Sequence, residues 1–405
     1  MRPASRLWKG LFEGLPTTFL WLWAGGFISA LASFAFPFLA LSLTARGVPP
    51  RTVGQVLSLL GFGVLLAGPL AGYFCDRVGR RRTLLASLLL ASAGASALGL
   101  VRSSSLTFLA ALLFGISSSA AASPIQAMVA DLVAPEARAR AFALLYWASN
   151  VGTGFSLVAG GFLAARGWAL PFLTDASTTL AFALVVLARV RETRPLPEER
   201  APEAAAKAGY ALVLRDGAFL AFLVALVPFA LVFYQVGVTL PIDMARSGLS
   251  PKTYGLVLSV NTALVVALQP FAPRLFSRCA HTTVLAVSAG VVGLGYGAYA
   301  LASSAASYAV ATAVWSLGEI GYAPAASAQA ALLAPPEMRG RYAGAFALCM
   351  GGAAALAPLL GTGLLQVFGR RVLFLSCLGL AALSSAALLA LGRARGRGRV
   401  SVLSA

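Results

Sequence analysis

The sequence predicts an all-α integral membrane protein with twelve transmembrane helices in two pseudo-symmetric bundles of six. Three observations favour this fold class. Hydrophobic residues make up 59% of the 405 residues and charged residues only 11%, whereas a soluble domain carries about 25% charged residues. Twelve stretches are long and apolar enough to cross a bilayer, which takes about 20 residues of helix. Short motifs also recur in the two halves of the chain at one fixed offset.

The predicted spans fall into two sets of six. The first set lies at residues 17–44, 52–74, 83–101, 106–131, 142–165 and 168–189. The second set lies at residues 214–243, 253–276, 283–303, 306–333, 342–367 and 371–391. The first apolar stretch is interpreted as a span, because it is too long for the core of a signal peptide.

A polar segment separates the two sets of spans. Residues 191–210 are rich in Glu, Arg, Pro and Ala, which is typical of a linker outside the membrane. We therefore predict an N-terminal six-helix bundle at residues 1–190 and a cytoplasmic linker at 191–210. A C-terminal six-helix bundle with a basic cytoplasmic tail follows at residues 211–405.

The basic residues predict the orientation of the chain. With a cytoplasmic N-terminus, 23 of the 31 lysines and arginines fall on the cytoplasmic side and 8 on the outer side. Because positive residues collect in cytoplasmic loops, we predict a multi-pass protein of the bacterial inner membrane with both termini in the cytoplasm. The same bias accounts for the net charge of +18 without a nucleic-acid partner. The basic tail at residues 393–399 is either a topology signal or a contact for anionic lipid headgroups.

Composition excludes several kinds of chemistry. The three lysines, Lys9, Lys207 and Lys252, lie outside any phosphate-binding loop of the P-loop type, so an ATPase site of that type is excluded. A single histidine, His281, and four cysteines without a CxxC pair give no pattern for a metal centre or a disulfide framework. We therefore expect no cofactor, no bound metal and no enzymatic activity.

An internal repeat relates the two halves of the chain. Residues 50–58 (PRTVGQVLS) align with residues 251–259 (PKTYGLVLS) at a shift of 201 positions. Residues 135–140 (PEARAR) align with residues 336–341 (PEMRGR) at the same shift. A repeat of six spans implies two bundles related by a pseudo-two-fold axis along the membrane normal. Such repeats can place a substrate site near the midplane and work by rocking one half against the other.

The segment between the second and third spans reads GYFCDRVGRRRT from Gly72 and is predicted to form a tight turn at the cytoplasmic face. Gly72 lets a neighbouring helix approach, and Gly79 permits a turn conformation. Asp76, next to Arg77, is a lone acid in a basic cluster. Its carboxylate is suited to accept hydrogen bonds from the N-terminus of a nearby helix. A turn held by such contacts can act as a latch between two packings of the helices.

The turn resembles the signature motif of the Major Facilitator Superfamily, GxLaDrxGr[rk], with Phe74 and Cys75 in place of the usual Leu and Ala. The resemblance implies that Asp76 caps a helix of the other half while the outward-facing state persists. It also implies that Arg80 pairs with an acid on the fourth helix, and Asp131 lies at the inner end of that span. The resemblance covers essentially the whole chain, since the spans, the linker and the repeat agree with the architecture of the family.

The branch of the family is less clearly marked. Ser277 stands at the position of the acid in the second copy of the motif, so we expect an asymmetric latch. Ala111 replaces an arginine that proton-driven drug exporters usually carry in the fourth helix. Ser156 and Leu157 stand where those exporters carry Gly-Pro in the fifth helix. The chain therefore resembles the multidrug (drug:proton antiporter) efflux branch only in part.

Glu319 is the first of two ionisable residues predicted to lie well inside the spans, where such groups are costly and mark functional sites. Trp315 and Tyr322 lie four residues before it and three after it, on the same helical face. A carboxylate beside two aromatic rings suits an organic cation or a transported proton. In the resembled family the first, fourth, seventh and tenth helices line the cavity, and Glu319 is in the tenth span. The alternative is a carboxylate satisfied by Ser or Thr hydroxyl groups of a neighbouring helix.

Asp175 is the second such residue, about 10 Å into the sixth span at 1.5 Å per residue. It is a further candidate for proton coupling, and the alternatives are an ion pair with Arg166 or solvation from the outer rim. The other candidates for substrate contact are the polar residues Gln126, Asn150, Tyr234, Gln235 and Asn261. For each of them the alternative is a hydrogen bond between helices.

These features predict a secondary active transporter that works by alternating access, most simply a proton-coupled exporter of small amphipathic or drug-like compounds. The alternative is a symporter, uniporter or lipid flippase of the same fold, which the missing arginine and the incomplete fifth-helix motif favour. A membrane enzyme or a sensor is disfavoured, because an enzyme needs clustered catalytic groups near one face. The expected partners are a small-molecule substrate, protons and membrane lipids, and we expect a monomer.

Overall fold

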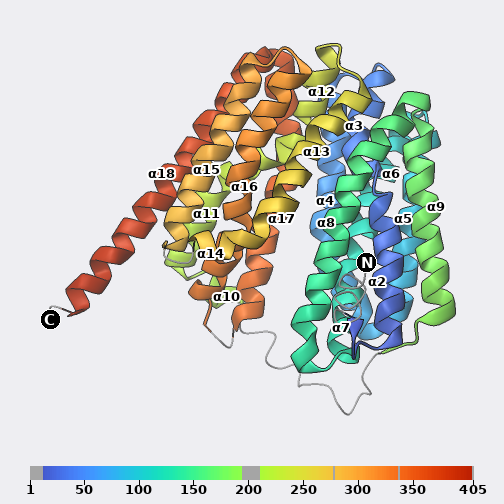
Figure 1. The fold of residues 1–405 in the computed structure, drawn as a ribbon, viewed down its shortest axis with the longest axis horizontal. Coiled ribbons are helices and arrows are strands. Elements are labelled where there is room, and N and C mark those ends of the chain that lie inside the picture. Colours follow the sequence, from blue (N-terminus) through green and yellow to red (C-terminus); the bar gives the residue numbers. More distant parts are fainter. Residues whose placement is uncertain (1–11, 194–209, 277–278, 336–337, 404–405) are drawn as a thin grey trace, which may run out of the picture. The chain divides into compact units, whose positions relative to one another are not determined.

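Helices account for the regular structure of the protein. The computed structural model describes residues 12–193, 210–276, 279–335 and 338–403. All regular elements in these residues are α-helices or short 3₁₀ helices (Figure 1). The predicted all-α fold class is therefore confirmed for the described part of the chain.

The chain divides into two compact units. The first unit comprises Met1–Leu39 and Phe62–Arg200, and the second comprises Ala40–Gly61 and Ala201–Ala405. The predicted division into residues 1–190, 191–210 and 211–405 stays a prediction, and residues 40–61 group here with the second unit.

The helices follow the predicted spans closely. Up to residue 193 they are α2 (Thr17–Leu31), α3 (Ala35–Ala45), α4 (Pro50–Arg77), α5 (Arg80–Leu100), α6 (Ser104–Ala120), α7 (Ala122–Leu132), α8 (Pro135–Arg166) and α9 (Ala169–Arg189). After residue 209 they are α10 (Tyr210–Val213), α11 (Gly217–Phe233), η3 (Tyr234–Gly237), α12 (Thr239–Arg246), α13 (Pro251–Leu268), η4 (Gln269–Phe271), α14 (Ala272–Phe276), α15 (His281–Ala298), η5 (Tyr299–Leu301), α16 (Ala305–Leu333), α17 (Arg339–Val367) and α18 (Gly369–Leu403).

Eleven helical stretches in the described residues are long and apolar enough to cross a membrane. The predicted tenth span, α16, is not among them, although it forms a helix of 29 residues. Glu319, two tyrosines and several serines lower the mean hydropathy of α16, which explains the difference. The eleven helices bear out a multi-pass membrane protein, and a twelfth span at α16 stays a prediction.

Several predicted spans, among them the first, the fourth and the seventh, are interrupted helices. The first consists of α2 and α3, with Pro37 in the first turn of α3, where its missing N–H leaves no helical bond unmade. The fourth consists of α6 and α7, because Pro124 has no N–H to donate to the carbonyl group of Ala120. The seventh consists of α11, η3 and α12. Pro228 and Pro324, by contrast, lie inside α11 and α16, which continue past them.

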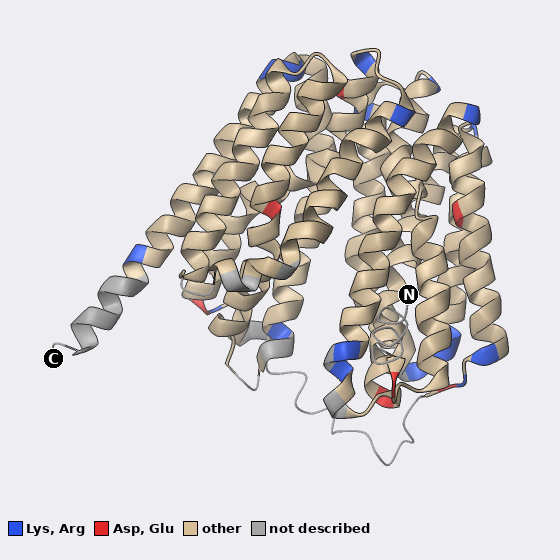
Figure 2. Ribbon diagram, in the orientation of Figure 1, with Lys and Arg blue, Asp and Glu red and all other residues tan. Residues whose placement is uncertain are grey.

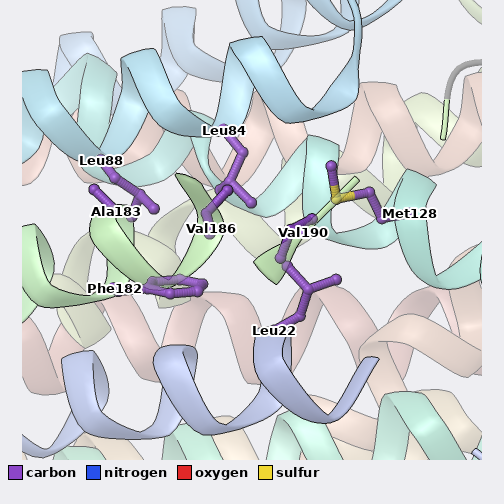
Figure 3. Packing of buried hydrophobic residues seen from close by; sticks show 8 residues of the cluster. All are labelled: Leu22, Leu84, Leu88, Met128, Phe182, Ala183, Val186 and Val190. Atoms are coloured by element: carbon purple, nitrogen blue, oxygen red, sulfur yellow. The ribbon is translucent and has the colours of Figure 1, made fainter. Parts of the chain in front are cut away.

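The first unit has an apolar core between α2, α5, α7 and α9. Figure 3 shows the side chains of this core: Leu22, Leu84, Leu88, Met128, Phe182, Ala183, Val186 and, just after α9, Val190. A Cβ atom on Gly25 would lie 2.1 Å from Cδ2 of Phe182, so glycine lets α2 approach α9. At Gly152 of α8 a Cβ atom would lie 2.7 Å from the carbonyl carbon of Ala30 in α2. Small residues at such crossings are typical of helix packing in membranes.

The second unit has an aromatic core between α11, α15, α16 and α18. The fully buried aromatic side chains of the second unit include Tyr254 of α13, Tyr299 of η5, and Tyr296, Tyr308, Phe219, Phe222, Phe229 and Phe374 of these four helices. Trp315 of α16 packs against Gly295 of α15, where a Cβ atom would lie 2.6 Å from the backbone nitrogen of Trp315. These contacts give α16 a well-defined rotation about its axis, which fixes the direction of its polar residues.

Residues 40–61 pack against α17 within the second unit. The Oγ of Ser58 accepts a hydrogen bond of 3.1 Å from the backbone N–H of Leu359. A Cβ atom on Gly61 would lie 2.8 Å from the carbonyl oxygen of Ala354, so this approach depends on glycine. The repeat is also visible in the helix starts, since α4 begins at Pro50 and α13 at Pro251, a shift of 201 residues.

Charged residues gather near the ends of the helices (Figure 2). Along the helices, large apolar side chains such as Leu89, Val224 and Val310 are about half exposed or more. An apolar exposed surface of this kind suits contact with lipid tails rather than water. The arrangement therefore agrees with the hydropathy of the eleven membrane-spanning helices.

Candidate functional site

Glu319 of α16 is bound to α13 through an asparagine. Its Oε2 accepts a hydrogen bond of 2.6 Å from Nδ2 of Asn261. The same Nδ2 donates to the Oγ of Ser316, one turn earlier on α16, over 3.0 Å. Glu319 is half-buried, and none of the described residues bonds to its Oε1. One carboxylate oxygen is thus held in place, and the other is left for a proton or a ligand.

The two aromatic neighbours of Glu319, which the sequence predicts beside its carboxylate, are core residues. Nε1 of Trp315 donates a hydrogen bond of 2.7 Å to Oη of Tyr299, and the side chain is 2% exposed. The ring of Tyr322 stacks on Phe229 of α11 with 3.5 Å between centroids. At about 100° per residue, the two side chains leave α16 roughly 40° and 60° to one side of Glu319. They therefore pack against α11 and α15, whereas Glu319 faces α13.

Tyr234 and Gln235 lie in η3 and differ in whether their side chains are free to contact a substrate. Gln235 is buried, and its Nε2 donates to the carbonyl oxygens of Ala357 and Leu231 over 2.9 Å and 3.1 Å. Its Oε1 accepts a hydrogen bond of 3.0 Å from Thr239, so the predicted role in substrate contact is replaced by a structural one. Tyr234 is half-buried with its ring against Phe233 and stays a candidate.

Gln126 and Asn150 belong to the first unit, whereas Glu319 and Asn261 belong to the second. Gln126 is exposed on α7. Asn150 donates a hydrogen bond of 2.8 Å to the carbonyl oxygen of Tyr146 in its own helix. In the described structure Asn150 therefore bonds within α8 and not to another helix, which was the alternative to substrate contact.

Asp175 of α9 caps the N-terminus of α3. Its Oδ2 accepts a hydrogen bond of 2.8 Å from the backbone N–H of Ala35, and its Oδ1 accepts one of 3.4 Å from Thr179. Asp175 is 6% exposed, which excludes solvation from the outer rim, and no ion pair with Arg166 is present in the described structure. The first N–H groups of a helix lack partners within it and favour negative charge. The carboxylate therefore supplies the acceptor that the first N–H group of α3 lacks where the first span is interrupted, at residues 32–34.

We expect Asp175→Ala to lower the stability of the protein by about 1–3 kcal/mol, because a buried backbone donor loses its acceptor. Asp175→Asn keeps an acceptor oxygen and should lose less. The measurement is the melting temperature of each purified variant in the same detergent. If Asp175→Asn melts like the wild type but loses gradient-driven transport, Asp175 carries protons and the capping role is insufficient.

Three contacts hold the turn between α4 and α5. The Nε of Arg80 lies 2.9 Å from Oδ2 of Asp131, so the ion pair expected from the sequence is present. The backbone N–H of Arg80 donates a hydrogen bond of 2.8 Å to Oε1 of Glu192. Gly79 has a φ of 115°, and a Cβ atom there would lie 2.4 Å from Oε2 of Glu192. Gly79 is thus required both for the turn and for the approach of Glu192. No sequence pattern singled out Glu192, an acid just beyond α9 that binds the N-terminus of α5.

The other latch residues predicted from the sequence are Gly72, Asp76 and Arg77. The side chain of Asp76 and residue Ser277 lie outside the described part of the structure. A Cβ atom on Gly72 would meet nothing within 4 Å in the described structure, so the expected close approach of a helix is absent here. Arg77 lies over the ring of Tyr73, 4.7 Å from its centroid. The role of this turn as a latch stays a prediction.

A second polar cluster, which no sequence pattern singled out, joins Asp243, Tyr308 and Arg370 in the second unit. Asp243 of α12 is 2% exposed, and its Oδ1 lies 3.2 Å from Nε of Arg370 in α18. The hydroxyl of Tyr308 in α16 donates a hydrogen bond to the other carboxylate oxygen. Nη2 of Arg370 also donates to the carbonyl oxygens of Tyr299 and Ala302 over 2.8 Å and 2.6 Å. This cluster ties together the ends of α12, α16 and α18.

The sequence profile of the Major Facilitator Superfamily matches residues 22–243 and 229–402. The chain is 24% identical to Multidrug resistance protein 2 of Bacillus subtilis over 60% of its own length and 64% of that protein, less than two thirds of the relative. It is 26% identical to Multidrug resistance protein MdtH of Enterobacter sp. over 78% of its length and 79% of that protein. It is also 26% identical to a Na(+), Li(+), K(+)/H(+) antiporter of Planococcus maritimus over 77% and 81% of the two chains.

Solved structures show the same fold. The nucleoside transporter NupG superposes with a TM-score of 0.77 at 12% identity and covers 93% of this chain and 99% of that one. The transporter PepTSo of the POT family superposes with a TM-score of 0.78 at 16% identity and covers 94% and 99%. At such low identity these likenesses concern the arrangement of the helices.

Proposed function

The chain belongs to the Major Facilitator Superfamily, and we propose that it exports small amphipathic or drug-like compounds in exchange for protons. It is a secondary transporter rather than an enzyme, since the family and the relatives above are transporters. We propose that α16 is the twelfth span, that the spans form two bundles of six, and that the protein works as a monomer by alternating access.

The contact between Glu319 and Asn261 carries this proposal. A half-buried carboxylate in a mostly apolar helix is energetically costly, because water is scarce there. Such a residue therefore marks a functional site. Asn261 holds one oxygen of the carboxylate at 2.6 Å and leaves the other without a partner in the described structure. That free oxygen can take up a proton or face a cationic substrate, and the two uses exclude each other. Competition for one carboxylate is the simplest way to couple export to proton entry.

Tyr234 is the further candidate that we assign to this site. It is half-buried beside the aromatic core, in which Tyr322 stacks on Phe229. Aromatic rings near a carboxylate favour organic cations. We further propose that the turn with Arg80 and Asp131 faces the cytoplasm of a bacterial cell and acts as a latch there.

Transport in proteoliposomes tests the coupling. We expect an imposed pH gradient to drive accumulation of a fluorescent lipophilic cation, ethidium, and a protonophore to abolish the accumulation. Liposomes without protein and liposomes with Glu319→Gln are the controls. Accumulation that is unchanged when the gradient is dissipated would contradict proton coupling.

A second candidate function is exchange of alkali cations for protons, which the similarity to the Planococcus maritimus antiporter favours. A carboxylate and an amide oxygen are hard ligands that also suit Na⁺ or K⁺. The same proteoliposomes distinguish the two functions if they contain a pH-sensitive dye. Collapse of the pH gradient on addition of Na⁺, Li⁺ or K⁺, without any effect of ethidium, would favour this candidate.

A further inference from the structure

An apolar groove lies on the first unit between α4, α5 and α6. Its volume is about 280 Å³, and its walls include Leu70 and Phe74 of α4, Val78 just after α4, Leu90 of α5, and Leu113 and Ile116 of α6. From residue 82 to residue 90 along α5 the groove extends about 12 Å, at 1.5 Å per residue. It is therefore long and narrow, which suits a hydrocarbon chain better than a compact solute.

The hydroxyl groups in the walls have no hydrogen left to donate to a ligand. Thr83 donates to the carbonyl oxygen of Gly79 over 2.7 Å, and Ser87 donates to that of Thr83 over 2.8 Å. Ser117 donates to the carbonyl oxygen of Leu113 over 2.6 Å. Each hydroxyl group is thus satisfied within its own helix. The walls of the groove therefore favour an apolar ligand along its length.

One cation lies at the end of the groove. Arg82 is exposed and lines the groove at the N-terminus of α5. Its two neighbours in the run of three arginines are already bound, Arg80 to Asp131 at 2.9 Å and Arg81 to the carbonyl oxygen of Leu187 at 2.7 Å. Arg82 has no hydrogen bond or ion pair among the described residues. Its guanidinium is therefore available to an anion on the side that the basic residues assign to the cytoplasm.

We propose that this groove holds an acyl chain of an anionic phospholipid whose phosphate pairs with Arg82. Basic pockets between helices on the cytoplasmic side are suited to anionic headgroups. Arginine binds phosphate with paired N–H groups. In a zwitterionic lipid, the ammonium group near the phosphate repels the guanidinium and weakens this contact. The apolar walls give little preference for one chain over another, because lipid tails are as apolar as the groove. The charge of Arg82 therefore sets the preference among headgroups, and the groove sets where the chain lies.

Lipid binding to the full-length protein tests this proposal. The purified protein in detergent is titrated with dioleoyl phosphatidylglycerol and with dioleoyl phosphatidylcholine, and native mass spectrometry counts the bound lipids. We expect a preference for phosphatidylglycerol that Arg82→Gln lowers roughly fivefold, equivalent to about 1 kcal/mol. The matched control is Arg191→Gln, because Arg191 is also exposed at that end of the unit but does not line the groove. An equal loss in both variants would overturn the proposal in favour of a general effect of charge.

A second variant tests the groove itself. Ala86 is exposed in the groove wall, and Ala86→Phe should fill the space and displace both lipids. Inorganic phosphate at millimolar concentration should not compete with phosphatidylglycerol, because it has no chain to occupy the groove. Unchanged lipid binding to folded Ala86→Phe, or full displacement by inorganic phosphate, would overturn the proposal in favour of a headgroup site alone. A melting temperature like that of the wild type shows that the variant is folded, and if Ala86→Phe does not fold, the Arg82→Gln comparison and the phosphate competition decide.

Discussion

Glu319→Gln is expected to abolish transport driven by a pH gradient while leaving the fold intact. Glutamine has nearly the shape of glutamate, and its carbonyl oxygen can still accept the hydrogen bond from Asn261. It cannot take up or release a proton, so we expect gradient-driven uptake to fall roughly tenfold or more. The measurement is the initial rate of ethidium uptake into proteoliposomes, per amount of folded protein. Exchange of labelled for unlabelled ethidium without a gradient should also weaken, because the substituted site no longer offers a negative charge to the cation.

The control for this variant is Glu13→Gln, which makes the same change on an exposed residue outside the predicted spans. Its uptake should equal that of the wild type. Asn261→Ala separates position from charge, since it leaves the carboxylate present but removes its hydrogen-bond donor. We expect that variant to transport with a shifted pH profile. If Glu319→Gln keeps the gradient dependence of the wild type, Glu319 has no part in proton coupling and the proposed mechanism is wrong.

The helices were predictable because a span needs only length and apolar composition, and both are local properties of the chain. The second and eighth spans were predicted from residues 52 and 253, and their helices begin two residues earlier, at Pro50 and Pro251, because proline suits the first turn of a helix. The interruption between α2 and α3 was not predictable. It depends on Asp175, a residue of a distant helix that supplies an acceptor for the N–H of Ala35. Contacts of this kind are determined by packing and leave no local pattern.

The candidate site was predicted in its residues but not in its geometry. Glu319 and Asn261 each stood out as polar groups in apolar spans, yet their contact depends on how α13 and α16 face each other. Trp315 and Tyr322 share a broad helical face with Glu319, but a turn of about 50° between the two directions is enough to place them in the core instead. Spacing along a helix therefore identified neighbours and could not decide which partner each one meets.

Asp243 and Arg370 were missed for a different reason. Arg370 was counted as a loop residue by the rule for basic residues, and Asp243 lies at the end of a predicted span, where an acid needs no explanation. Only the folded second unit brings them within 3.2 Å of each other and buries Asp243. An ion pair formed by residues 127 positions apart is invisible to any local pattern in the sequence.

The Asp243–Arg370 pair leads to the second large prediction, that Arg370→Ala strongly destabilises the protein. The substitution leaves a carboxylate that is 2% exposed without its cation, and it frees the carbonyl oxygens of Tyr299 and Ala302. Removing one partner of a buried ion pair costs about 3–5 kcal/mol. Because the side chain of Arg370 is 31% exposed, water can reach the site in part, and we expect the lower end, about 3 kcal/mol. That loss corresponds to a fall in melting temperature on the order of 5–10 °C for a unit of this size.

Arg371 provides the matched control, since it is the next residue, carries the same charge and is exposed. Arg371→Ala should melt within about 1 °C of the wild type, because exposed charges away from such contacts contribute little. Asp243→Asn in the Arg370→Ala background should recover part of the loss, because the uncompensated charge is then removed while the acceptor for Tyr308 remains. Equal melting temperatures for Arg370→Ala and Arg371→Ala would show that the pair is solvated and does not hold α12 and α18 together. No recovery in the double variant would instead assign the loss to the carbonyl contacts of Arg370 rather than to the buried charge.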